Sequence, residues 1–252
     1  MKTALVTGTS YGMGEAIARK LLAEDWKVYG VSRSKGKLYH DNFRWIKCDL
    51  ADQHQIESCL SAITENSLDA FISNAGVIIV EDATEVSRQA YEATFSVNVL
   101  APMLLVHNLK PKIKKATIIS ISSVADRLPE PAIALYCSSK AANTSYFNSL
   151  AQELTSADVI TILPDYVETP MLHSTMDSDK TFDWTCTINP DDIAKLCSDI
   201  INKIKKIETG SNIIVVTEAL KEDLRDTEKL CSFNTDTQQL ATLSAPFNSF
   251  SH

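Results

Sequence analysis

The fold is decided by the stretch Thr7-Gly8-Thr9-Ser10-Tyr11-Gly12-Met13-Gly14, which joins a short apolar β-type run to a segment with apolar side chains at helical spacing. In this strand–turn–helix context, three glycines predict a turn that binds phosphate at a helix N-terminus. We expect Gly8 to form the tight turn, Gly12 to let the backbone approach a pyrophosphate, and Gly14 to allow close packing of helix and strand. The stretch therefore predicts a dinucleotide-binding fold.

The same alternation continues along the chain. Strands are expected over residues 3–7, 27–32, 44–48, 70–73, 116–122, 159–163 and 212–216. Helices are expected over residues 13–24, 53–65, 88–109 and 135–154, and from Pro190 onward with Asn189 as N-cap. Short apolar strands separated by helices indicate right-handed βαβ units. The pattern predicts an α/β fold, a single Rossmann-like doubly wound domain with a seven-stranded parallel sheet and helices on both faces, over residues 1–217.

Two segments depart from this regularity. Residues 169–189 form a connection that is longer than usual, which favours a lid or binding loop. Residues 218–252 end in a stretch rich in Ser, Thr, Asn and Gln, after one charged helix expected over Lys221 to Leu230. We expect this C-terminal tail to be mobile or to dock on a partner subunit, and the sequence leaves both alternatives open.

Composition narrows the class of protein. Lys and Arg number 24 against 32 Asp and Glu, so the net charge is −8, which argues against a nucleic-acid partner. No apolar stretch approaches the roughly 18 residues that span a bilayer, and residues 1–7 are too short for a signal peptide. The six cysteines contain no C-x-x-C pair and no Cys/His cluster with zinc spacing. We therefore expect a soluble, cytoplasmic chain with reduced thiols and no metal.

The end of the second expected strand bears on the choice of cofactor. Dinucleotide folds that bind NAD usually place a carboxylate there, which binds the ribose 2′-hydroxyl. Here Ser32 and Arg33 stand at that point, and a guanidinium can pair with the 2′-phosphate of NADP. The residues predict a preference for NADP(H).

Tyr136 and Lys140 lie four residues apart on the helix expected over 135–154, so their side chains share one face. A phenol has a pKa of about 10, too high for proton exchange near neutrality. A nearby ammonium group and an oxidised nicotinamide both favour the phenolate, so we expect the pKa of Tyr136 to be lowered. The pair can then exchange a proton with a carbonyl or alcohol oxygen.

With its T-G-x-x-x-G-x-G turn and its Y-x-x-x-K pair, the sequence resembles the short-chain dehydrogenase/reductase family over roughly residues 1–217. The resemblance implies a catalytic set of Asn98, Ser123, Tyr136 and Lys140. Ser123 stands 13 residues before Tyr136, as in the family, and the adjacent Ser122 is the alternative. Asn98 would help to hold a water that connects Lys140 to solvent, and Ser123 would bind the substrate oxygen.

The resemblance also implies the cofactor site. Asp49 and Leu50 match an adenine-side contact, and Asn74-Ala75-Gly76 matches a motif that borders the cofactor and stabilises the sheet. Val167 and Thr169 match a V-x-T motif that holds the nicotinamide carboxamide. The predicted cofactor-binding residues are Gly8, Ser10, Tyr11, Gly12, Met13, Gly14, Ser32, Arg33, Asp49, Leu50, Asn74, Ala75, Gly76, Tyr136, Lys140, Val167 and Thr169.

Three positions depart from the family pattern. Asp165 replaces a glycine after the sixth strand, where aspartate tolerates a left-handed backbone and could contact the nicotinamide or the substrate. Asp126 stands where S-x-x-G is common after the catalytic serine. The run Val215-Val-Thr-Glu218 lacks the frequent D-G-G turn. These departures bear on the substrate pocket and on subunit contacts.

These observations predict an NADP(H)-dependent oxidoreductase of the carbonyl reductase or alcohol dehydrogenase type, which transfers hydride between nicotinamide C4 and a carbonyl or secondary alcohol. The alternative is a catalytically silent NADP(H)-binding regulatory or scaffold subunit. We expect a small, apolar or mixed substrate, because the expected pocket walls over residues 124–135 and 169–189 include Leu128, Leu135, Met171, Leu172 and Trp184. The resemblance further implies a homo-dimer or homo-tetramer that associates through helices near 88–109 and 135–154.

Overall fold

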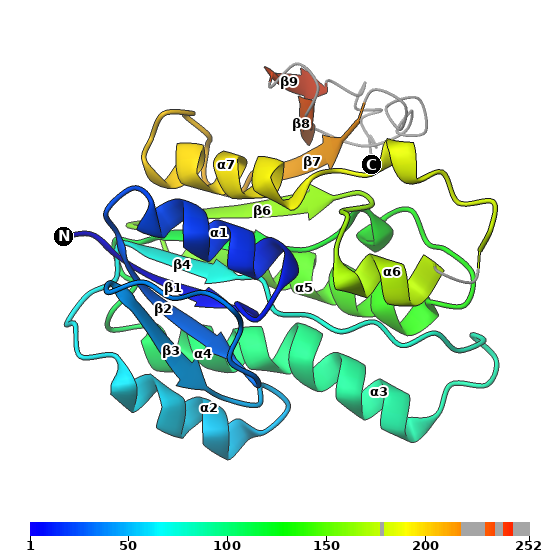
Figure 1. Cartoon of the computed structure of the whole chain (residues 1–252), viewed down its shortest axis with the longest axis horizontal. Coiled ribbons are helices and arrows are strands. Elements are labelled where there is room, and N and C mark those ends of the chain that lie inside the picture. The colour runs from blue at the N-terminus through cyan, green and yellow to red at the C-terminus, as the bar shows by residue number, and fades with distance from the viewer. Residues whose placement is uncertain (177–178, 218–229, 235–238, 244–252) are drawn as a thin grey trace, which may run out of the picture.

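The computed structural model of the chain describes residues 1–176, 179–217, 230–234 and 239–243. Its centre is a parallel sheet whose first seven strands follow the order β3-β2-β1-β4-β5-β6-β7 (Figure 1). The strands are β1 (Thr3–Thr7), β2 (Lys27–Ser32), β3 (Phe43–Lys47), β4 (Ala70–Ser73), β5 (Thr117–Ile121), β6 (Asp158–Pro164) and β7 (Asn212–Val216). The predicted seven-stranded parallel sheet is confirmed. The strands before β4 are added to one side of β1 and those from β4 onward to the other side, so β1 and β4 flank the switch point at which such folds bind ligands.

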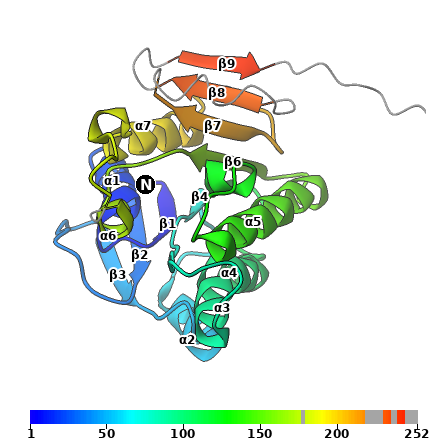
Figure 2. The ribbon, with the colours of Figure 1, turned by 90° about the vertical axis from the view of Figure 1, so that its right-hand side faces the viewer.

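Helices cover both faces of the sheet, as Figure 2 shows. They are α1 (Gly12–Leu22), α2 (Gln53–Cys59), α3 (Arg88–Phe95), α4 (Ala101–Leu109), α5 (Ala134–Glu153), α6 (Pro170–Met176) and α7 (Pro190–Ile201). One buried cluster joins α1 and α7 to the sheet, and a second joins α2, α4 and α5 to the opposite face. The doubly wound arrangement follows from these two apolar layers.

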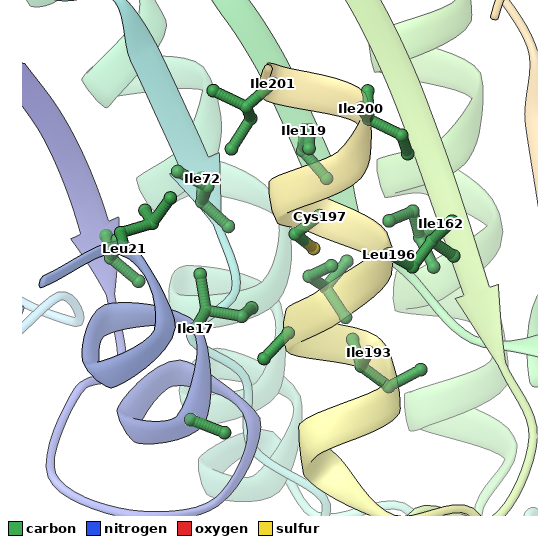
Figure 3. Close-up of a cluster of buried hydrophobic side chains, with 14 of the residues drawn as sticks. Ile17, Leu21, Ile72, Ile119, Ile162, Ile193, Leu196, Cys197, Ile200 and Ile201 are labelled. Atoms are coloured by element: carbon green, nitrogen blue, oxygen red, sulfur yellow. The ribbon is translucent and has the colours of Figure 1, made fainter. Parts of the chain in front are cut away.

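The layer formed by α1 and α7 on one face of the sheet helps to explain why the parallel strands are nearly continuous apolar runs. Ile17 of α1 and Leu196 of α7 are buried against sheet residues such as Ile119 (Figure 3). Side chains of the same strands that point the other way meet the second layer, so both faces of the sheet are covered and most strand positions are apolar. At the start of α7 the Asn189 side chain accepts a hydrogen bond of 2.9 Å from the Asp191 backbone N–H, which confirms the predicted N-cap.

The helix predicted over residues 88–109 is present but interrupted. A turn of π-helix, Ser96–Leu100, separates α3 from α4. Within it, Asn98 turns its side chain toward Val77, from whose backbone N–H it accepts and to whose carbonyl it donates, both at 2.8 Å. Helical periodicity cannot register one extra residue in a turn, and π-turns of this kind occur often at functional sites.

Two further strands lie beyond β7 in the segment that we expected to be a mobile or docked tail. β8 (Leu230–Asn234) pairs in parallel with β7, and β9 (Gln239–Leu243) pairs antiparallel with β8. The pattern did not predict them, because a strand of five residues with mixed composition cannot be told from a loop by periodicity. The helix expected over Lys221 to Leu230 lies outside the described residues, apart from Leu230, which begins β8.

In the part of the chain that the structure describes, no helix combines the length and the apolar character that a bilayer crossing requires.

Candidate active site

The glycine-rich turn lies between β1 and α1, and its geometry fits the three roles expected from the sequence. Gly8 and Gly12 have φ values of 78° and 64°, in the left-handed region that favours glycine. A Cβ on Gly14 would lie 2.2 Å from the Gly8 carbonyl oxygen, so only glycine lets helix and turn approach this closely. The turn is thus shaped by glycine at two left-handed positions and at one close approach, and the expected contact of Gly12 with a pyrophosphate stays a prediction.

The start of α1 offers backbone donors to a ligand. Tyr11 at the N-cap makes no side-chain capping hydrogen bond, so the first N–H groups of α1 have no such partner. Nearby, the Oδ1 atom of Asn74, a residue that lines the adjoining cleft, is buried and has no hydrogen-bond partner within the described residues. An uncapped helix N-terminus beside an unpaired polar atom fits the phosphates and polar edges of a dinucleotide.

A cleft runs along the carboxyl ends of β1, β2 and β4 and gathers most of the predicted cofactor residues. The predicted residues that line it are Gly8, Ser10, Tyr11, Gly12, Met13, Ser32, Arg33, Asp49, Leu50, Asn74, Ala75, Gly76 and Thr169. Gly14 packs behind the turn instead, and Val167 lines a second cavity. The cleft is also lined by residues that were not predicted for the cofactor, which are Val31, Ser34, Cys48, Val77, Val97 and Met171. All but Met171 are chain neighbours of predicted residues, and this adjacency was the available signal; Met171 had been expected in the substrate pocket.

The Asn74-Ala75-Gly76 motif is fixed by β1. Thr7 Oγ1 accepts hydrogen bonds of 2.9 Å from the backbone N–H groups of Asn74 and Ala75. The Asn74 side-chain amide donates to the Thr7 carbonyl at 2.8 Å. These bonds tie the ends of two neighbouring strands together and hold one wall of the cleft rigid.

At the end of β2, two serines organise the loop and leave Arg33 exposed at the cleft. The Ser32 hydroxyl donates to the Ser34 carbonyl at 2.9 Å and accepts from the Trp45 indole at 3.0 Å. Ser10 of the glycine-rich turn donates to the same carbonyl at 2.7 Å. The Ser32 hydroxyl is therefore occupied within the chain, and Arg33 is the group here that is placed to meet an anion.

A second cavity of about 300 Å³ adjoins this cleft. Met13, Thr169 and Met171 line both. Ser123 and Tyr136, two of the predicted catalytic residues, line the second cavity. The structure thus brings the proposed reacting hydroxyl groups to the point at which a dinucleotide cleft meets a substrate-sized space.

The expected lowering of the Tyr136 pKa is wrong for the chain's own residues. Burial raises the pKa of Tyr136 to about 12, and a side-chain hydrogen bond with Ser123 offsets only part of this. Lys140 Nζ lies 5.5 Å from the centre of the Tyr136 ring and donates to the Ile121 carbonyl at 3.0 Å. Desolvation outweighs the help from neighbouring groups, so Tyr136 is a neutral phenol near pH 7.

Lys140 is buried, and its charge is costly. Desolvation lowers the pKa of Lys140 to about 8, and the negative charge of Asp126 acts in the opposite direction. Asp126 is itself held by Arg127, whose Nε lies 2.7 Å from Asp126 Oδ1. The residue found where the family usually has glycine therefore supplies a buried negative charge toward Lys140.

Asn98 belongs to a buried polar network around Lys140. Its side-chain amide donates to Ser139 Oγ at 2.9 Å, and its backbone carbonyl accepts from the Asn143 side chain at 3.0 Å. A Cβ on Gly76 would lie 3.4 Å from Asn98 Oδ1 and 3.5 Å from Lys140 Nζ, so both groups border this glycine. The structure brings Asn98 and Lys140 together, as the resemblance implied.

The two serine alternatives differ in their surroundings. Ser122 donates to the Lys140 carbonyl at 3.2 Å and accepts from Thr144 at 2.7 Å, so its hydroxyl ties β5 to α5. Ser123 accepts a bond of 3.2 Å from the Ala125 N–H and hydrogen-bonds with Tyr136. Ser123 is thus the serine whose hydroxyl lies with the phenol.

Comparison with known proteins agrees with this geometry. The family model described as short chain dehydrogenase matches residues 2–180. The chain belongs to the short-chain dehydrogenase/reductase family. It is therefore an oxidoreductase of a family that binds a nicotinamide dinucleotide.

Individual members of the family are distant. This short-chain dehydrogenase is 30% identical to an uncharacterised oxidoreductase of Saccharomyces cerevisiae over 68% of this chain and 72% of the other. It is 29% identical to a benzil reductase ((S)-benzoin forming) of Bacillus cereus, over 68% and 78% of the two chains. Its fold matches a 3-ketoacyl-(acyl-carrier-protein) reductase of Brucella melitensis, solved with NADH, at a TM-score of 0.78, 24% identity and coverage of 84% and 96%.

Where this short-chain dehydrogenase departs from the family pattern, the structure shows local consequences. Asp165 is not among the described residues with positive φ, so the position needs no left-handed backbone, and Asp165 lines the second cavity. Of the run from Val215, Val215 and Val216 are buried in β7 and Glu218 lies outside the described residues.

The expected cavity walls are correct only in part. Met171 and Leu172 of α6 line the second cavity, which supports a binding role for the 169–189 connection. Leu128, Leu135 and Trp184 do not line it; Leu128 packs on a small core cluster, and Trp184 stacks on His173 with 4.3 Å between ring centroids. Glu130 lies within the expected wall over residues 124–135 but was not singled out, and Tyr166 lies outside both expected walls, because loop composition does not show which side chains face inward.

Proposed function

We propose that this chain is an NADP(H)-dependent oxidoreductase that transfers hydride between the nicotinamide and a carbonyl or secondary alcohol. The proposal rests on one observation: Tyr136 and Ser123 line a cavity that shares a wall with the dinucleotide cleft. A carbonyl in that cavity can reach both hydroxyl groups. The family membership supports the same reaction class.

When bound, the dinucleotide supplies or accepts the hydride. Tyr136 donates its proton to the substrate oxygen, and its pKa of about 12 means that the phenol is protonated near pH 7. Ser123 donates a hydrogen bond that orients this oxygen and stabilises its developing charge. The protonated phenol is the form that carbonyl reduction requires, and the phenolate is the form that alcohol oxidation requires.

Lys140 and Asn98 support the reacting pair from behind. A cationic Lys140 near the Tyr136 ring stabilises the phenolate that forms when the proton is transferred. The Asn98 backbone carbonyl and side chain hold the polar network beside Lys140. We assign to this network the return of a proton to Tyr136 after each cycle.

The cofactor preference rests on Arg33. A guanidinium at the cleft pairs with a 2′-phosphate, and the Ser32–Ser34–Ser10 contacts hold the loop that presents it. Replacing Arg33 by Ala should raise KM for NADPH by about tenfold or more, with little change for NADH. Equal effects on both cofactors would contradict the NADP(H) preference.

The test of the function is NADPH oxidation with a panel of ketones, beginning with aromatic diketones and acetophenones because a benzil reductase is among the relatives. Wild type should turn over members of the panel, and Tyr136→Phe should lose about 10²- to 10⁴-fold in kcat while its Kd for NADPH stays the same. Tight NADPH binding without turnover of any member would instead identify a silent cofactor-binding subunit.

A further inference from the structure

The second cavity has an uneven lining. Apolar side chains form part of its wall, among them Ile78, Ile133 and Leu172. The carboxylates on its wall are those of Glu130, Asp165 and Asp179, and the described residues that line it include no lysine, arginine or histidine. A ligand in this space meets hydrocarbon and negative charge, but no basic side chain of the described lining.

Glu130 is the cavity carboxylate whose charge acts on Tyr136, the proposed proton donor. Burial is the main cause that raises the pKa of Tyr136 and of Tyr166, and the negative charge of Glu130 adds to both shifts. The Tyr166 hydroxyl donates a side-chain hydrogen bond to Glu130. The carboxylate therefore faces the same space as the reacting phenol and has a defined partner there.

The backbone around Glu130 is rigid. Glu130 stands between Pro129 and Pro131, so the proline that follows restricts it to extended conformations. Ala132 then has a φ of 62°, and its carbonyl accepts a hydrogen bond of 2.9 Å from the Glu81 N–H. A strained residue held by a neighbouring segment is the kind of feature that fixes a functional side chain in place.

Tyr166 is positioned from its other side. Its ring meets Phe182 edge to face, with 5.1 Å between centroids and an interplanar angle of 86°. Phe182 in turn contacts Trp184 at 4.9 Å. The aromatic contacts orient the Tyr166 ring, and the Tyr166 hydroxyl takes one side of the Glu130 carboxylate, which leaves its remaining lone pairs for a ligand.

We propose that Glu130, oriented by Tyr166, is the specificity determinant for a protonated amine on the ketone or alcohol substrate. The inference rests on the proposed function, since the carbonyl is placed at Tyr136 and Ser123. An ammonium group at the other end of the substrate pairs with Glu130, whereas a carboxylate there is repelled. The substrate class is thus the amino ketones and amino alcohols with an apolar body.

The experiment uses three ketones of one shape: 4-(aminomethyl)acetophenone, 4-ethylacetophenone and (4-acetylphenyl)acetate, which carry a cation, no charge and an anion at the same place. Wild type with NADPH should show kcat/KM for the amine about tenfold above the neutral ketone, and for the anion about tenfold below it. Glu130→Gln keeps the size of the side chain and should bring the three values close together. Glu57→Gln, on an exposed position of α2, is the matched control and should leave the order unchanged.

Equal ratios in wild type and Glu130→Gln would overturn the inference, as would a wild type that prefers the anion. Calorimetric binding of the same three compounds to the NADPH-loaded protein separates this question from the proposed reaction. Amine-selective binding that Glu130→Gln abolishes, without any turnover, would uphold the charge preference and refute the reductase activity. Binding without selectivity would refute the assignment of Glu130 even if the ketones are reduced.

Discussion

The dinucleotide cleft and the substrate cavity lie side by side, yet the residues of the cleft could be predicted from the sequence far better than those of the cavity. The cleft is built from turns that directly follow strands, so its residues come in short motifs, such as the glycine-rich turn and Asn74-Ala75-Gly76. Most of the described cavity lining comes from two stretches of chain, residues 122–136 and 164–176, together with Asp179. Its surface is set by which side chains a loop turns inward, and no spacing rule records that choice.

The difference has an energetic side. Cleft residues are held by backbone geometry and by hydrogen bonds such as those that Thr7 Oγ1 accepts from the backbone N–H groups of Asn74 and Ala75. A substitution that displaces this backbone breaks these bonds. Cavity residues are held by side-chain contacts, such as that of Tyr166 with Phe182. We therefore expect substitutions in the cleft to affect folding and cofactor binding together, and substitutions in the cavity to affect mainly the reaction.

The adjacent residues Ser123 and Ser122 provide the most direct comparison. The Ser123 hydroxyl lies with Tyr136, whereas the Ser122 hydroxyl bonds to α5. Ser123→Ala should reduce kcat by about 10²- to 10³-fold, because it removes a donor from the substrate oxygen. Ser122→Ala removes a bond between β5 and α5 and should cost about 1 kcal/mol of unfolding free energy while kcat stays within a few-fold of wild type. Steady-state kinetics and urea unfolding of both variants measure this. A larger loss of kcat in Ser122→Ala would reverse the assignment.

A substitution at Lys140 tests whether the buried ammonium group beside Tyr136 lowers the stability of the folded protein. The folded pKa of Lys140, about 8, lies below its ordinary value of 10.5, so the unfolded chain binds more protons between these values and stability rises with pH there. Lys140→Met removes the buried cation, and below pH 8 the variant should gain up to about 3 kcal/mol in unfolding free energy relative to wild type.

The measurement for Lys140 is urea unfolding of wild type and Lys140→Met from pH 6.5 to 10.5. The advantage of the variant should shrink as the pH passes through the folded pKa of about 8 toward 10.5. A difference that stays constant over this range would show that burial does not disfavour the charged amine. Asp126 keeps its partner Arg127 in the variant, so no unpaired carboxylate complicates the comparison.

The last comparison concerns two glycines at the cleft, Gly14 and Gly76. Gly14→Ala places a Cβ 2.2 Å from a backbone carbonyl and should cost about 1 to 3 kcal/mol of stability and weaken NADPH binding. Gly76→Ala is the matched variant, because its Cβ would meet nothing closer than 3.4 Å. Thermal unfolding with and without NADPH compares the two. Similar losses would mean that close packing at Gly14 is not what the turn requires.

Much of the fold could be predicted because strands and helices are local patterns. The seven parallel strands, the glycine-rich turn and the Asn189 cap each follow from a few consecutive residues. The π-turn at Asn98 and the strands β8 and β9 escaped prediction, since one depends on a side chain pairing with Val77 and the others on pairing with the β7 edge. Both are contacts between distant segments.

The sequence by itself determined the layered α/β architecture, because spacing along a strand or helix fixes direction in space, and its resemblance to the family implied the cleft residues and the four side chains proposed for catalysis. Only the tertiary structure decided the proton state of Tyr136, the role of Ser122 and the presence of Glu130 in the cavity. Desolvation depends on everything that packs around a group, and the sequence does not state what will surround it.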